Sequence, residues 1–219
     1  AGVTLVTPTE ILATHLLEVV KHNFSRLLTL KSLRRTLGEL VNISDPTRAE
    51  ANRKMLDELI PEKGPIDVLH AVLRLLLDEQ VSIRNLPLIL EAVAEARGQK
   101  AQPEAICEHV RQRLGFQLVA ELRRADGTLP LVQLAPEWED TFNAYQVDGD
   151  RGLDIALPPD LFNQLAESAS QKLGEASENG IYAAVVTNTR RRRFLRTVMR
   201  AKGVSNPVLS FEEIGIDAR

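Results

Sequence analysis

Arginine dominates the stretch from 187 to 200, which reads TNTRRRRFLRTVMR. Four consecutive arginines followed by two more at helical spacing could bind phosphate groups, face another protein, or simply face water. The apolar residues between them recur at intervals of three and four, which predicts an amphipathic helix. The predicted basic interaction surface on its outer side consists of Arg192, Arg193, Arg196 and Arg200.

Motifs that would supply catalytic or nucleotide-binding groups are missing from the sequence. It contains no G-x-x-x-x-G-K-[ST], G-x-G-x-x-G, G-x-S-x-G or H-E-x-x-H segment. The four histidines are scattered, and no two lie four residues apart as metal-binding pairs on a helix do. The acidic stretch VDGDRGLD at 147–154 lacks the closing glutamate of a calcium loop, so we expect a turn there. We therefore expect no enzymatic activity, no catalytic residue, no cofactor and no metal site.

Composition argues against a nucleic-acid-binding protein. The formal net charge is -3, so no basic field surrounds the whole chain. Aromatic residues make up 4%, which is too few for a base-stacking platform. A hydrophobic content of 44% and a charged content of 26% are typical of a globular protein. A nucleic-acid-binding regulator that uses residues 190–200 is the alternative to a protein-binding surface.

Helical periodicity fills the first half of the chain and gives way to mixed elements near residue 115. Residues 30–41 are predicted to form a helix, and Gly115 is predicted to end the last helix of this half. Loose alternation across 116–134, with a turn at Asp126-Gly127, predicts a β-hairpin. Strands and helices then alternate to the end. The predicted fold class is α+β, an all-helical subdomain followed by a small α/β subdomain with a mixed sheet.

Three segments, in this order, resemble the FlhA/LcrD family of export-gate proteins from flagellar and virulence type III secretion. They are VTPTEILATHLLEVV at 6–20, IPEKGPIDVLHAVLRLLLDEQVSIRNLPLILEAVAEA at 60–96 and RRRRFLRTVMRAKGVSNPVLSFEEI at 190–214. The resemblance implies that residues 1–23 end a preceding subdomain. It also implies a helical subdomain over 24–115 and an α/β subdomain over 116–219.

The resemblance also implies a function. Members of the family form a ring, usually of nine subunits, that docks export chaperone–substrate complexes and helps order their export. A separate ATPase complex and other export-apparatus proteins are further partners. The full-length protein would be anchored in the bacterial inner membrane by an N-terminal half that is absent from this chain. The chain itself would face the cytoplasm. The ATHL motif at 13–16 places Thr14, with Ile11 beside it, in the dimple where chaperones dock.

Overall fold

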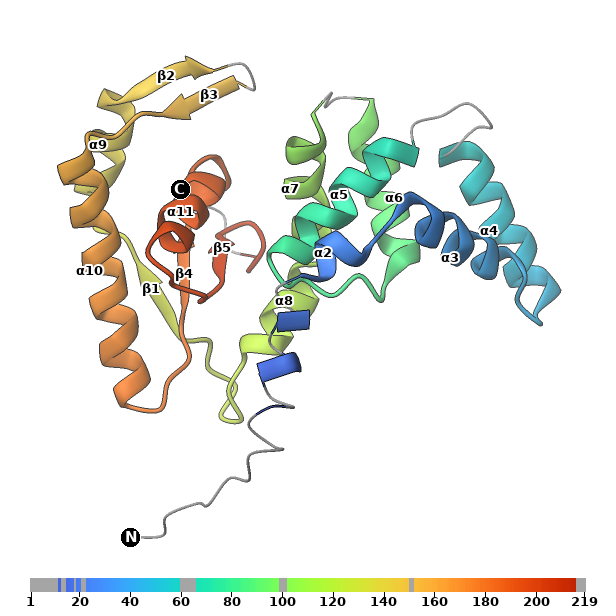
Figure 1. Ribbon diagram of the computed structural model, residues 1–219, viewed down its shortest axis with the longest axis horizontal. Helices are drawn as coiled ribbons and strands as arrows, with labels where there is room; N and C mark the ends of the chain where they lie inside the picture. Colours follow the sequence, from blue (N-terminus) through green and yellow to red (C-terminus); the bar gives the residue numbers. More distant parts are fainter. Residues whose placement is uncertain are drawn as a thin grey trace, which may run out of the picture. The chain divides into compact units, whose positions relative to one another are not determined.

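The computed structural model describes residue 12 and residues 15–17, 19–20, 23–59, 66–98, 102–149 and 152–215 (Figure 1). The chain divides into two compact units, Ala1–Arg111 and Gln112–Arg219. The first contains α2 (Phe24–Leu27), α3 (Leu30–Val41), α4 (Pro46–Leu59), α5 (Ile66–Asp78), α6 (Leu86–Arg97) and most of α7 (Pro103–Arg113). The second contains α8 (Gly115–Leu122), β1 (Leu131–Gln133), α9 (Glu137–Ala144), β2 (Gln146–Gly149), β3 (Gly152–Ile155), α10 (Pro159–Glu178), β4 (Ala184–Thr187), α11 (Thr189–Ala201) and β5 (Val208–Ser210). None of the described helices is long and apolar enough to cross a membrane.

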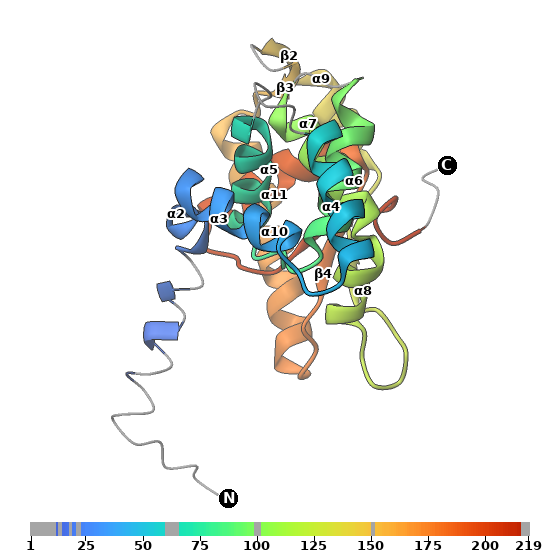
Figure 2. The same ribbon diagram turned by 90° about the vertical axis from the view of Figure 1, so that its right-hand side faces the viewer.

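The first unit is built around α5, against which α2 and α3 pack (Figure 2). Helix α5 is apolar on most sides and buries Leu69, Val72, Leu73 and Leu76. The predicted helix over 30–41 is confirmed as α3. Its first turn is fixed by a capping box, in which Thr29 and Ser32 exchange side-chain and backbone hydrogen bonds.

The second unit is a three-stranded parallel sheet with helices packed on it. The strand order is β1-β4-β5, and every neighbouring pair is parallel. Helices α10 and α11 pack side by side and share a core with the sheet, in which Leu165, Leu195 and Val185 are fully buried (Figure 1). Strands β2 and β3 form a separate antiparallel pair. The predicted α+β class is confirmed, with the parallel and antiparallel pairs in two sheets.

The predicted β-hairpin across 116–134 is wrong. Its first half is helix α8, which buries Leu118 and Val119. Its second half contains β1, which pairs in parallel with β4 instead of with its neighbour in sequence. Leu114 and Leu118 are four residues apart, a helical spacing that the loose alternation of the segment obscured.

Helix α7 ends at Arg113, two residues before the glycine predicted to end it, and Gly115 also begins α8. Another segment of backbone lies directly against it. A Cβ atom at this position would collide with the carbonyl oxygen of Glu213. Glycine is therefore required here for close approach and not for a left-handed backbone conformation.

We expect Gly115→Ala to lower the free energy of unfolding of the second unit by about 1–3 kcal/mol, because the added methyl group must displace the Glu213 backbone. Gly174→Ala is the matched control within the same unit. Gly174 is exposed inside α10 with no atom within 4 Å of an added Cβ, so this change should stabilise the unit by about 0.5–1 kcal/mol. Urea unfolding followed by circular dichroism measures both. Similar changes for the two variants would contradict the close contact.

Candidate interaction surface on the arginine helix

The two residues expected to dock chaperones, Thr14 and Ile11, lie outside the described residues. Leu12 and Leu16, two described residues of the same segment, are 68% and 60% exposed. The candidate surface that the structure does describe is the arginine-rich helix α11.

Helix α11 follows directly from the buried strand β4. Asn188 is its N-cap residue, and the side-chain Oδ1 accepts a hydrogen bond from the backbone N–H of Arg191 at 3.0 Å. Leu195, Val198 and Met199 are buried on the face that packs on the sheet. These contacts set the rotation of the helix and so decide where each arginine points.

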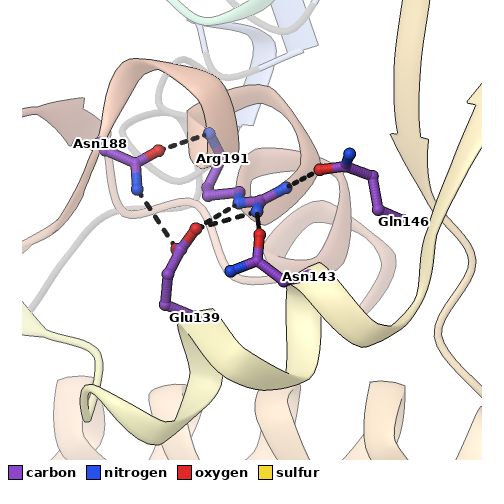
Figure 3. A network of polar contacts seen from close by, with 5 residues as sticks. All are labelled: Glu139, Asn143, Gln146, Asn188 and Arg191. Atoms are coloured by element: carbon purple, nitrogen blue, oxygen red, sulfur yellow. Dashed lines mark hydrogen bonds and ion pairs between the residues drawn. The ribbon is translucent and has the colours of Figure 1, made fainter.

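Arg191 points from the first turn of α11 toward α9 and β2 (Figure 3). Its Nε and Nη2 atoms lie 2.9 and 2.8 Å from Oε1 of Glu139. Its Nη2 also donates to Oδ1 of Asn143 at 2.6 Å, and its Nη1 donates to Oε1 of Gln146 at 3.4 Å. Asn188 completes the network by donating to Oε2 of Glu139 at 3.3 Å. Arg191 thus links α11 to α9 and β2 through partly buried polar contacts.

Arg192 does not belong to the outer face, and its predicted place on the basic interaction surface is wrong. Its side chain is 0% exposed. The Nη1 atom donates to the carbonyl oxygen of Val208 at 3.3 Å, and Nε lies 3.8 Å from Oε1 of Glu213. Arg192 precedes Leu195 by three residues and Met199 by seven, so it lies on the side of the helix that packs on the core.

Glu213 is fixed by its own turn as well as by Arg192. Its Oε2 accepts a hydrogen bond from the backbone N–H of Ser210 at 2.9 Å. In return, the Ser210 hydroxyl accepts from the backbone N–H of Glu213 at 3.1 Å. This is a capping box, and its S-x-x-E pattern was readable in the segment SFEE. The pattern could have identified Glu213 as an anchored carboxylate, although not its partner.

The outer face of α11 carries the other three residues of the predicted surface. Arg193 and Arg200 are exposed, and Arg196 is half-buried. Tyr182, which was not predicted from the sequence, is 58% exposed, and the charge of Arg196 acts on its phenol group. Partial burial raises the pKa of the Tyr182 phenol, and the nearby arginine opposes that rise. The phenol therefore remains a neutral hydrogen-bond donor at physiological pH.

A surface of this kind suits the binding of anions. A guanidinium group stays charged and offers a planar set of donors that match a carboxylate or a phosphate. The described part of the chain contains no group of three or more His, Cys, Asp or Glu side chains that could hold a metal ion. The exposed guanidinium groups of α11 can contact a carboxylate or phosphate group of another molecule.

Proteins of known family and known structure resemble this chain in sequence and in fold. The FHIPEP family model matches residues 1–219. The chain is 33% identical over 218 residues to the flagellar biosynthesis protein FlhA of Caulobacter vibrioides, an alignment that covers 100% of this chain and 30% of that protein. Nonameric SctV-C from EPEC superposes with a TM-score of 0.78 at 19% identity, covering 96% of this chain and 60% of that one. A chain of the Chlamydia pneumoniae CdsV and CdsO complex gives 0.77 at 22% identity, with 97% and 60% coverage.

We expect Arg192→Met to lower the free energy of unfolding by about 3–5 kcal/mol, because it removes the cation beside the buried Glu213 carboxylate. Arg193→Met, one position along on the exposed face, should change it by less than about 0.5 kcal/mol. The double variant Arg192→Met/Glu213→Gln should recover part of the loss because it carries neither buried charge. Urea denaturation midpoints compare the variants. Equal destabilisation by the two single substitutions would exclude the buried pair.

Proposed function

Because the chain belongs to the FHIPEP family, we propose that it is the cytoplasmic part of a type III protein-export gate. In this proposal it forms a ring with other subunits and docks export chaperone–substrate complexes. The ring helps to set the order in which flagellar or injectisome proteins leave the cell. The observation that carries the proposal is the similarity to an FlhA protein along the whole chain.

The related structures support the assembly and partner aspects of this proposal. SctV-C, which shares the fold, is nonameric, and a ring of this chain would follow the same geometry. CdsV forms a complex with CdsO, which supports contacts between this chain and other export-apparatus proteins. We include the ATPase complex among the proposed partners. The chain spans 30% of the FlhA relative, so the whole protein has room for a part in the inner membrane with this chain on the cytoplasmic side.

We further propose that the chain works by binding and catalyses no reaction. The positions of the arginines argue against the nucleic-acid-binding alternative. Arg191 and Arg192, two of the four consecutive arginines, lie beside carboxylates of the protein itself. Fewer positive charges on α11 then face outward to neutralise phosphate groups.

The test is isothermal titration of a purified chaperone–substrate pair into the complete cytoplasmic region of the protein. We expect binding that Thr14→Lys weakens at least about tenfold, because a long charged side chain would replace a small neutral one at the proposed interface. Thr36→Lys, at an exposed position of α3, is the matched control and should leave the affinity unchanged.

Duplex DNA serves as a second titrant in the same experiment. Absence of chaperone binding together with salt-sensitive DNA binding would replace the export-gate proposal with the nucleic-acid alternative. Equal losses for Thr14→Lys and Thr36→Lys would remove Thr14 from the docking site.

A further inference from the structure

The outer arginines, defined as Arg193, Arg196 and Arg200, form a stripe along α11. They are separated by three and four residues, so they follow one side of the helix over two turns, or roughly 10 Å. The thirteen residues of α11 include no aspartate or glutamate. The stripe is therefore a line of guanidinium groups on a rigid element, to which α11 itself contributes no carboxylate.

Arg196 is held in place at the middle of this stripe. Its Nη1 atom donates to the backbone carbonyl oxygen of Asn206 at 3.4 Å. The Asn206 side chain in turn donates to the backbone carbonyl oxygen of Ala183 at 2.9 Å. Ala183 directly follows Tyr182 in the chain, so one chain of hydrogen bonds connects the stripe to the segment that carries the exposed ring. Less conformational entropy is lost on binding when a side chain is already ordered.

The combination of residue types is that of a protein-binding surface. Tyrosine and arginine are enriched among the residues that contribute most to binding between proteins. Tyr182 offers an apolar ring face together with a neutral hydroxyl donor, and it is 58% exposed. A partner that fits must bring negative charge to the arginines and an apolar side chain to the ring.

We propose that Tyr182 and the outer arginines form a docking surface for an acidic helix of a partner protein. Carboxylates at positions i, i+3 or i+4, and i+7 of that helix pair with the stripe, and one apolar side chain packs on Tyr182. A helix is favoured over an extended peptide because its side chains repeat at the same intervals as the arginines. The proposal goes beyond chaperone docking at Thr14 and does not depend on it.

A peptide titration tests this proposal with the full chain. The probe is a helical peptide of about 20 residues with glutamates at i, i+4 and i+7 and one neighbouring leucine. A permuted peptide of identical composition distributes the same glutamates around the helix. Fluorescence anisotropy should show binding of the first peptide, weakened by salt, and binding of the permuted peptide that is at least about fivefold weaker.

Variants of the chain locate the binding surface. Arg193→Glu/Arg200→Glu should weaken binding of the matched peptide about tenfold or more, and Tyr182→Ala about fivefold. Arg34→Glu/Arg48→Glu makes the same change in net charge at exposed positions of the first unit and should leave binding unchanged. The variants replace exposed side chains, and an unchanged thermal midpoint verifies that they are folded.

Three results would overturn the proposal. They are no binding of the matched peptide, equal binding of the permuted peptide, and equal losses from the two double charge reversals. Chaperone titration of Arg193→Glu/Arg200→Glu separates this proposal from the export-gate function. Normal chaperone affinity with lost peptide affinity would confirm two distinct surfaces. Loss of both affinities would overturn the claim that the peptide binds a surface separate from the chaperone site.

Discussion

A guanidinium group buried away from water requires a carboxylate beside it, and the Arg192–Glu213 pair meets that requirement in the second unit. Arg192 comes from α11 and Glu213 from the turn that follows β5, so the pair joins a helix to the segment leaving the edge strand. The capping box with Ser210 holds the carboxylate in place through contacts that do not involve the arginine. Rotation of α11 about its axis would separate two charges in a low-dielectric interior, which is costly. The pair therefore fixes the orientation of the helix.

That fixed orientation explains why the arginines of one helix lie in two different settings, some buried beside carboxylates and others exposed. Arg191 is held by Glu139 and lies over the Phe142 ring, with 5.7 Å between the guanidinium carbon and the ring centroid. Since Arg191 and Arg192 are neighbours held in different directions, the helix has little freedom to turn. Arg193 and Arg200 consequently project from the opposite side. Arginine suits both settings because it keeps its charge when buried and presents several donors in one plane.

Local sequence signals predicted those elements whose causes are local. Helix α3 was predicted with its observed bounds, because its helical periodicity lies within the segment itself. The prediction for Arg192 failed because its charge was taken as a reason to place it on the outer face, although its spacing to Leu195 and Met199 fits the core side. The sequence does not show that a carboxylate from beyond the next strand lies beside it. Glu139 was missed as the partner of Arg191 for the same reason, since they lie 52 residues apart. The short alternation after Gly115 fitted a strand as well as a helix, and only packing decides between them.

The close contact between Gly115 and Glu213 also bears on how the protein is made. Gly115 lies in the first helix that is wholly within the second unit, and Glu213 lies in the last described turn of that unit. The contact therefore joins residues from near the two ends of the unit's sequence. During synthesis the N-terminal part of a chain leaves the ribosome first, and a domain completes its folding once the residues of its last contacts have emerged. The second unit therefore cannot close until the segment carrying Glu213 has emerged. A chain truncated just before that residue would lack the backbone contact at Gly115 and the carboxylate beside Arg192, and the loss of stability would expose it to proteolysis in the cell.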